Sequence, residues 1–161
     1  MGVKKKIVVT GAAGFLGSHL CEKLRNLNYN VVGIDSMIGG DIDNLPKDLE
    51  FYKLDCCNFQ KVNKIMKGVD VVYHCAATAH EGLSVFSPVT ISKNNYLATA
   101  SVVSAAINNK AKRIIYCSSM ARYGNQATPF TEDMKTIPVD PYGIAKVAGE
   151  ELLKNLCNLN K

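Results

Sequence analysis

The stretch "KIVVTGAAGFLGSHL" (Lys6–Leu20) joins a short apolar run to a helical pattern through a glycine-rich turn. Gly11, Gly14 and Gly17 follow the spacing G-x-x-G-x-x-G across this junction. A turn of this kind lets the backbone approach a pyrophosphate, whose charge then lies at the N-terminus of the following helix. Because the turn follows a strand pattern and opens a helix, we expect the first unit of a dinucleotide-binding sheet.

The same alternation continues along the chain. Strand patterns occur at "VVGID" (31–35), "LEFYKLD" (49–55), "VDVVYHCAA" (69–77) and "AKRIIYCSS" (111–119), and helical patterns occur at 59–68, at about 87–109 and from about 141 to 159. Residues 36–48 are expected to form a loop with room for one helical turn. Continuous apolar strands that alternate with helices indicate a parallel sheet covered on both faces. Right-handed crossovers make such a sheet doubly wound. The sequence therefore predicts an α/β fold of the Rossmann type, with about five strands, in one domain that spans residues 1–161.

Composition excludes several classes of function. The formal charge of +5 is diffuse apart from Lys4–Lys6, and basic residues do not interleave with aromatic ones, so we expect no nucleic-acid binding. No apolar run approaches the length of a membrane span and no signal peptide precedes the first strand, which favours a cytoplasmic protein without membrane contact. The six cysteines form no C-x-x-C pair and are expected to be reduced, mostly buried thiols. His19, His74 and His80 form no ligand cluster with them, so no metal site is expected.

Two aspartates follow predicted strands and suggest a cofactor. Asp35 ends the second strand, where a carboxylate can accept hydrogen bonds from the adenosine ribose and repel the 2′-phosphate of NADP. The following "SMIGGD" contains no Arg or Lys to neutralise that phosphate, so NAD is favoured over NADP. The alternative for Asp35 is a cap on the next turn. Asp55 ends the third strand, where it is placed either to reach the adenine amino group or to form the turn in "LDCCN".

A candidate catalytic pair lies in "PYGIAK" (141–146). Tyr142 and Lys146 are four residues apart and share one face of a helix. An ammonium near a phenol favours the phenolate, so we expect Lys146 to lower the pKa of Tyr142. Such a tyrosine can take a proton from an alcohol while a nicotinamide takes the hydride. Ser118 and Ser119 end the fifth strand, and one of them can hydrogen-bond the same alcohol.

Taken in order, "TGAAGFLGSHL", "HCAA", "NNYLAT", "CSSMARYG", "PFTED" and "DPYGIAK" resemble the motifs of extended short-chain dehydrogenases/reductases. Within that family the chain looks most like the NAD-dependent nucleotide-sugar epimerases of the UDP-glucose 4-epimerase type. The resemblance implies a catalytic set and a cofactor-binding set. The catalytic set consists of Ser119, Tyr142 and Lys146, with Asn95 in a structural role. The cofactor-binding set consists of Gly11, Gly14, Phe15, Leu16, Gly17, Asp35, Asp55, Ala76 and Ala77, together with Tyr142 and Lys146.

Some positions depart from the family pattern. Ala98 of "NNYLAT" replaces the usual glycine of the family's N-x-x-G-T segment, three residues after Asn95. Arg122 occupies a usually aliphatic position, where it either faces a sugar phosphate or is a solvated loop residue. His74 fits a structural role in the family, and His80 has a weaker claim on function. Family members continue into a lobe that grips the nucleotide sugar, so the chain is expected to be the cofactor-binding part only: a truncated product, an expression fragment or one piece of a split enzyme.

The resemblance implies three alternative functions. In an epimerase, Tyr142 and NAD would oxidise the 4-hydroxyl of a nucleotide-diphosphate sugar, and the hydride would return to the other face. A 4,6-dehydratase or a reductase of the same family is the second alternative. Dehydratases carry an acidic pair where this chain has Met120 and Ala121, which argues against elimination. The third is a non-catalytic NAD-binding fragment. Family members commonly dimerise through helices of this region, so a homodimer or self-association through the long helices is expected.

Overall fold

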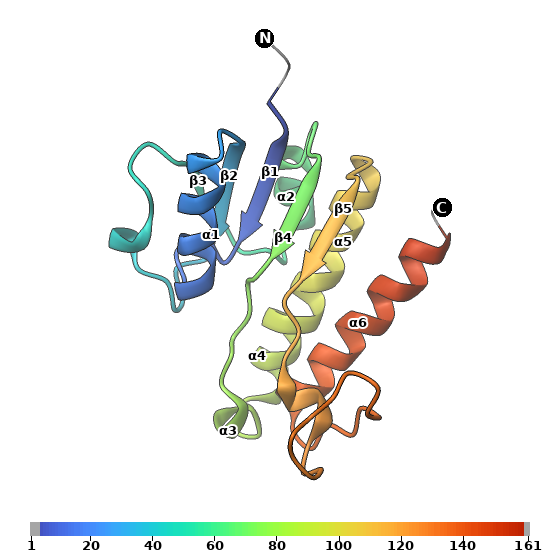
Figure 1. The fold of residues 1–161 in the computed structure, drawn as a ribbon. Coiled ribbons are helices and arrows are strands. Elements are labelled where there is room, and N and C mark those ends of the chain that lie inside the picture. Colours follow the sequence, from blue (N-terminus) through green and yellow to red (C-terminus); the bar gives the residue numbers. More distant parts are fainter. Residues whose placement is uncertain (1–3, 160–161) are drawn as a thin grey trace.

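The computed structural model describes residues 4–159. Within them, five parallel strands form one sheet in the order β3-β2-β1-β4-β5 (Figure 1). The strands are β1 (Lys6–Thr10), β2 (Asn30–Asp35), β3 (Glu50–Lys53), β4 (Val71–His74) and β5 (Arg113–Tyr116). The predicted fold class is confirmed, although the last three strands are shorter than their apolar patterns because the backbone leaves the sheet before each pattern ends.

Helices connect the strands as the sequence predicts. They are α1 (Phe15–Asn26), α2 (Phe59–Ile65), α3 (Glu81–Ser84), α4 (Pro88–Ile91), α5 (Ala98–Asn108) and α6 (Pro141–Leu159), with 3-10 turns η1 (Ile42–Asn44) and η3 (Met120–Tyr123) and a π-helical segment η2 (Ser92–Leu97). The loop expected at 36–48 contains only the single turn η1. The predicted last helix has the bounds of α6. Between residues 4 and 159, no helix combines the length and the apolar character that crossing a bilayer requires.

The sheet is covered on both faces because successive strand side chains point to opposite sides. On one face, Ile7 and Val9 of β1 pack with Cys21 and Leu24 of α1. On the other, Val8 of β1 packs in a cluster that includes residues of α2 and α5. Helix α6 packs on α5 beyond β5, which leaves the outer side of β5 without a strand partner in the described chain (Figure 1).

The predicted helix over 87–109 runs from α4 through η2 into α5, and its middle is a π-helix. Asn95 lies in this wide turn and is buried. Its side chain accepts a hydrogen bond from the Thr78 amide at 3.1 Å and donates one to the Ile91 carbonyl at 2.9 Å. The wide turn thus places an amide side chain under the segment that follows β4, and such turns often occur at functional sites.

The cysteines differ from the expectation of mostly buried thiols. Cys21 and Cys56 are buried, whereas Cys57, Cys75 and Cys117 are half-buried. Cys157 is exposed on the last turns of α6. Cys75 and Cys117 follow β4 and β5 instead of lying inside them, so they emerge at the rim of the sheet rather than in its core.

Candidate active site

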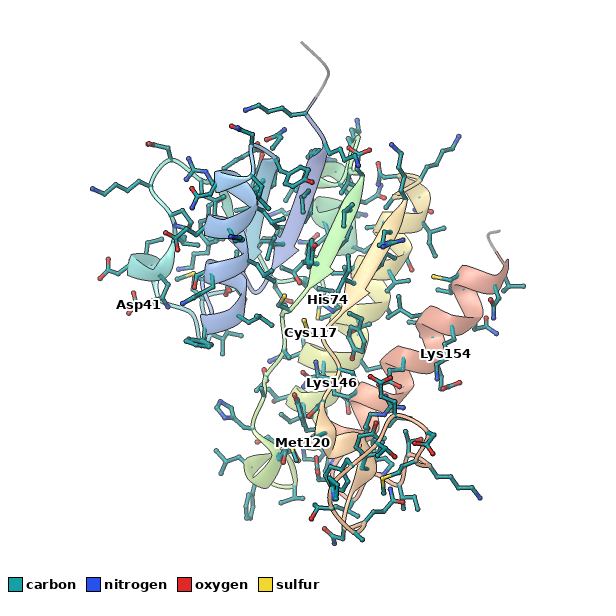
Figure 2. All side chains as sticks on the ribbon, in the orientation of Figure 1. Asp41, His74, Cys117, Met120, Lys146 and Lys154 are labelled. Atoms are coloured by element: carbon teal, nitrogen blue, oxygen red, sulfur yellow. The ribbon has the colours of Figure 1, made fainter. Side chains whose placement is uncertain are left out.

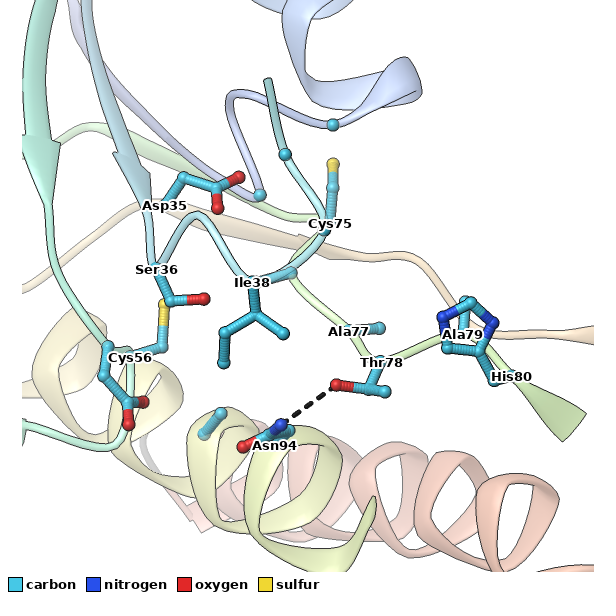
Figure 3. A pocket seen from close by; sticks show the side chains of 17 residues that line it. Asp35, Ser36, Ile38, Cys56, Cys75, Ala77, Thr78, Ala79, His80 and Asn94 are labelled. Carbon is cyan, nitrogen blue, oxygen red and sulfur yellow. Dashed lines mark hydrogen bonds between the residues drawn. The ribbon is translucent and has the colours of Figure 1, made fainter. Parts of the chain in front are cut away.

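A cleft of about 270 Å³ opens at the carboxyl edge of the sheet (Figure 3). It lies where the strand order reverses between β1 and β4, the point at which open α/β sheets bind their ligands. Six residues of the predicted cofactor set line it: Gly11, Gly14, Asp35, Asp55, Ala76 and Ala77. Residues from four separate connections of the sheet therefore meet in one cavity.

The glycine turn forms one wall of the cleft and is packed too closely for side chains. Gly11 has a φ of +70°, and a Cβ there would lie 2.7 Å from the amide nitrogen of Ala76. A Cβ on Gly17 would lie 2.0 Å from the carbonyl oxygen of Gly11. Gly14 caps α1 and has no side chain that could occupy the amides of the first helical turn. These amides include those of Phe15 and Leu16, whose side chains are exposed.

Asp35 ties the turn after β2 to the glycine turn. Its carboxylate accepts hydrogen bonds from the amide of Ala13 at 3.0 Å and from the amide of Met37 at 2.8 Å. The capping alternative from the sequence is therefore present in the structure, and the same carboxylate also lines the cleft. Among the described residues that line the cleft, none is a lysine or an arginine. This part of the site thus presents a negative charge and, from residues 4–159, no basic partner for a 2′-phosphate.

Asp55 forms the turn that one of its two alternatives predicted, and it also lines the cleft. It accepts a hydrogen bond from the Cys57 amide at 2.8 Å, which forms the turn, and it pairs with Lys93 at 3.2 Å. Burial raises the pKa of Asp55, but the Cys57 amide and the Lys93 ammonium outweigh burial, and the net pKa is lowered. The lowered pKa favours the ionised form of this cleft-lining carboxylate.

The predicted catalytic residues come together beyond β5. Tyr142 and Lys146 of α6 are 6% and 3% exposed, and the Lys146 Nζ lies 5.7 Å from the centre of the Tyr142 ring. A hydrogen bond joins Ser119 to Tyr142, and Ser119 also accepts one from the Ala121 amide at 3.1 Å. Ser118 instead hydrogen-bonds Glu150. Of the two serines that the sequence left open, Ser119 is the partner of the phenol.

The expected effect of Lys146 on the pKa of Tyr142 is wrong for this structure. Burial raises the pKa of Tyr142, the hydrogen bond with Ser119 lowers it, and the charges of Glu81 and Asp140 raise it again, so the net direction is upward. Lys146 donates its hydrogen bond to the Cys117 carbonyl at 2.7 Å rather than to the phenol. Burial lowers the pKa of Lys146 to about 8.

His74 has the structural role expected of it. It is 1% exposed, with its ring nitrogens 2.6 Å from the Thr10 hydroxyl and 3.0 Å from the Thr99 hydroxyl. Burial and the charge of Lys146 lower the pKa of His74 to about 3, so the imidazole is neutral. It links β1, β4 and α5. His80, in contrast, lines the cleft.

Arg122 is not the solvated loop residue of one alternative from the sequence, and it does not line the cleft. Its guanidinium pairs with Glu150 at 3.1 Å, and both side chains are largely covered. The guanidinium also lies 5.0 Å from the centre of the Tyr123 ring. The pair joins η3 to α6 and so fixes the segment that carries Ser119 against the helix that carries Tyr142.

Comparisons with known proteins show the family of this chain. The family model described as "NAD dependent epimerase/dehydratase family" matches residues 7–161. The chain belongs to this family. It is 36% identical over 151 residues to a putative UDP-glucose 4-epimerase of Methanocaldococcus jannaschii, covering 92% of this chain and 50% of that protein. It is 32% identical over 160 residues to the UDP-glucose 4-epimerase of Bacillus subtilis, covering 93% of this chain and 47% of that protein.

Solved structures of family members share the fold. The UDP-glucose 4-epimerase of Thermotoga maritima, solved with UDP-glucose, superposes with a TM-score of 0.91 at 31% identity, covering 95% of this chain and 51% of that one. The Thermus thermophilus enzyme, solved with NAD, gives a TM-score of 0.91 at 28% identity, covering 96% of this chain and 51% of that one. The chain therefore spans about half the length of the relatives it matches, and the prediction of NAD as the cofactor of the family is confirmed.

Two features of this epimerase/dehydratase family member were not anticipated from its sequence. Thr78 lines the cleft, and its hydroxyl accepts a hydrogen bond from the Asn94 side chain at 3.0 Å (Figure 3). The asparagine pair in "NNYLAT" was the available signal, because two adjacent amides in an apolar helix require polar partners. The second feature is the close approach of Cys75 and Cys117. Between residues 4 and 159, no three His, Cys, Asp or Glu side chains are grouped closely enough to hold a metal ion.

Proposed function

We propose that this chain binds NAD(H) in the cleft and supplies the proton-transfer residues of a nucleotide-sugar 4-epimerase. The observation that carries the proposal is the Tyr142 phenol, hydrogen-bonded to Ser119 and one helical turn from the buried Lys146. This set lies at the same carboxyl edge of the sheet as a cleft with a glycine turn and a strand-end carboxylate. The names of the relatives at 36% and 32% identity support the reaction class.

The residues of the cleft fit a dinucleotide. The uncapped N-terminus of α1, beside Gly11 and Gly14, would hold the pyrophosphate through backbone amides. Asp35 would accept hydrogen bonds from the adenosine ribose, and Asp55, which also lines the cleft, would recognise the adenine edge. Ala76, without a long side chain, leaves the floor of the cleft open. When bound, NAD would supply the chemistry of accepting a hydride and returning it.

The chain's own residues would handle the proton. The raised pKa of Tyr142 keeps its phenol protonated at neutral pH in this structure, and the hydroxyl of Ser119 shares the phenol's hydrogen bond. A positive charge placed near the phenol would lower that pKa and let Tyr142 take a proton from a substrate alcohol. Ser119 would orient that alcohol. Lys146 would contribute an ammonium, whose Nζ is held in place by the hydrogen bond that it donates to the Cys117 carbonyl.

Epimerisation is favoured over elimination by the segment after Ser119. A dehydratase needs an acid and a base in addition to the tyrosine, whereas this position holds Met120, which is exposed, and Ala121, which is buried. The neighbouring carboxylate, Glu150, is engaged by Ser118 and Arg122. We infer that the substrate is a nucleotide-diphosphate sugar and that recognition of its sugar requires residues beyond those of this domain.

The cofactor assignment is tested by calorimetry with NAD and NADP. We expect NAD to bind at least tenfold more tightly, a difference of about 1.4 kcal/mol, because Asp35 lines the cleft without a basic neighbour. Asp35→Asn should narrow the difference by removing the charge that repels a 2′-phosphate. The matched control is Asp43→Asn, which changes an exposed carboxylate outside the cleft. Equal affinities of the unaltered chain for both cofactors would show that Asp35 does not face the ribose.

The reaction is tested by fusing this chain to the remaining half of the Thermotoga maritima relative, which matches it at a TM-score of 0.91. Interconversion of UDP-glucose and UDP-galactose is measured. We expect turnover in the fusion and none above background in its Tyr142→Phe form, which loses only a hydroxyl. Turnover that survives Tyr142→Phe would refute the assignment of the proton-transfer residue.

A further inference from the structure

Two cysteines meet at the rim of the sheet. Cys75 directly follows β4 and Cys117 directly follows β5, and these strands are parallel neighbours. The register pairs His74 with Tyr116, and the next backbone hydrogen bond runs from the Cys117 amide to the His74 carbonyl at 3.1 Å. The two cysteines therefore occupy the next matching positions, and their Sγ atoms are 3.5 Å apart.

This placement is compatible with a disulfide. Neighbouring strands lie about 4.8 Å apart, within the range of about 4.4–6.8 Å that separates the Cα atoms of bonded cysteines. A bond of about 2.05 Å would need the sulfurs to approach by roughly 1.5 Å, which rotation about the side-chain torsions can supply. Both side chains are half-buried, and Cys75 lines the cleft (Figure 3), so a small molecule can reach the pair.

The surroundings activate one of the two sulfurs. The Cys75 thiol can donate a hydrogen bond to a Cys117 thiolate, and this bond lowers the pKa of Cys117 to about 6, against burial and with help from the charge of Lys146. The same bond and burial raise the pKa of Cys75. Figure 2 shows Cys117 and Lys146 close together below the tip of β5. A reactive thiolate beside a protonated thiol is the arrangement of an attacking cysteine and its resolving partner.

We propose that Cys75 and Cys117 are an oxidation site, at which a peroxide converts the pair to a reversible intramolecular disulfide. The Cys117 thiolate attacks one oxygen of hydrogen peroxide, the O–O bond breaks, and hydroxide leaves, which gives a sulfenic acid. Cys75 then attacks that sulfur, its proton goes to the departing hydroxyl, and water leaves. The two thiols lose two electrons in total and the peroxide gains them. A dithiol reductant reverses the change.

The disulfide would lie between the cleft and the candidate catalytic lysine. Lys146 donates its hydrogen bond to the carbonyl of Cys117, and the negative charge of a Cys117 thiolate raises the pKa of Lys146. Oxidation removes that charge. The proposal does not depend on NAD binding, because the bond forms between residues of the free chain.

The test is peptide mapping after exposure of the folded chain to hydrogen peroxide, with free thiols blocked before digestion. The background is Cys157→Ser, which removes the exposed thiol of α6 and with it disulfides between molecules. We expect a loss of two free thiols, a linked peptide containing Cys75 and Cys117, and full recovery on reduction. In Cys75→Ser the reaction should stop at a sulfenic acid on Cys117, detected with a dimedone probe.

Two results would overturn the proposal. One is oxidation of Cys57 or a link from Cys75 to the buried Cys21 while Cys117 remains free for alkylation. The other is oxidation of the pair only in urea, which would mean that the folded chain shields it. Peptide mapping of the Cys157→Ser chain alone shows whether Cys75 and Cys117 become linked. The test therefore does not require a Cys75 or Cys117 variant to fold. Calorimetry with NAD on the reduced chain is a separate experiment, so failure of the cofactor assignment would be recognised independently.

Discussion

Replacement of Lys146 by methionine is expected to stabilise the folded chain at neutral pH. Lys146 is 3% exposed, and its Nζ donates one hydrogen bond to a backbone carbonyl. The nearby carboxylate, Glu150, is bound to Ser118 and Arg122 instead. Within residues 4–159, the buried ammonium thus has no ion-pair partner at hydrogen-bonding distance. Methionine keeps an unbranched apolar stem of similar length and removes the charge.

The magnitude follows from the pKa. Burial lowers the pKa of Lys146 from 10.5 to about 8, and each tenfold loss of proton affinity corresponds to about 1.4 kcal/mol. Below pH 8 the folded state therefore loses about 3 kcal/mol relative to a neutral side chain. Because the folded pKa is below the unfolded one, this loss disappears as the pH rises from 8 to 10.5. Subtracting about 1 kcal/mol for the lost hydrogen bond leaves a net gain of about 2 kcal/mol in Lys146→Met at pH 7.

The assay is urea unfolding followed by circular dichroism at pH 7 and at pH 10. The difference in the free energy of unfolding between Lys146→Met and the unaltered chain should shrink or change sign at the higher pH. Lys154→Met, which removes an exposed ammonium from the same helix, controls for the general loss of a lysine. The comparison of lysine with methionine at position 146 is repeated in Cys117→Ser. This variant removes the thiolate whose negative charge raises the pKa of Lys146 against the effect of burial. A difference that does not vary with pH would refute the inference that the Lys146 charge is destabilising.

Three further outcomes follow from the site and the surface. Asn95→Ala should lower the free energy of unfolding by about 2 kcal/mol, because it leaves buried backbone groups without hydrogen-bond partners. Urea unfolding measures this change, and Asn94→Ala, which loses one partly buried hydrogen bond, is the control. Ser119→Ala should raise the pKa of Tyr142 further, since the hydrogen bond with Ser119 lowers it. The pKa is measured by titrating tyrosinate absorbance, with the signal of the other tyrosines subtracted by means of Tyr142→Phe. A titration curve that Ser119→Ala leaves unchanged would contradict this expectation. The edge of β5, which has no strand partner in the described chain, and the exposed side chains of α3, α4 and α6 should make the chain self-associate. Saturating NAD should raise its melting temperature. Light scattering that shows a monomer, or a melt that NAD leaves unchanged, would count against these expectations.

Local patterns in the sequence predict most of the fold and the candidate site. The strands and the glycine turn follow from the period of apolar residues and from glycine spacing, and both depend only on neighbours in the chain. Tyr142 and Lys146 are equally local, since one helical turn brings them together. The pKa of Tyr142 could not be predicted, because its direction depends first on burial of the phenol and then on Ser119 and the charge of Glu81, all of which tertiary packing sets.

Other errors have the same origin. The Arg122–Glu150 pair joins two elements whose packing the sequence does not reveal. The approach of Cys75 and Cys117, 42 residues apart, depends on the register of two parallel strands. Spacing rules such as C-x-x-C detect only cysteines that are near in the chain, so a pair formed by strand register escapes them. Contacts across the sheet, rather than contacts along the chain, set the chemistry at its rim.

The reversal of strand order between β1 and β4 also divides the domain into two modules that can be engineered separately. Asp35 and the 36–40 segment of the cleft belong to the β1-β2-β3 side, whereas Ser119 and Tyr142 follow β5 on the other side. The loop after β2 rests on the glycine turn through the hydrogen bond from the Asp41 amide to the Ala13 carbonyl. Loop grafting at 36–40 should therefore vary which dinucleotide is accepted, while the residues proposed for proton transfer keep their sequence and their packing. Recombination between relatives could exchange the two modules at the β3–β4 connection.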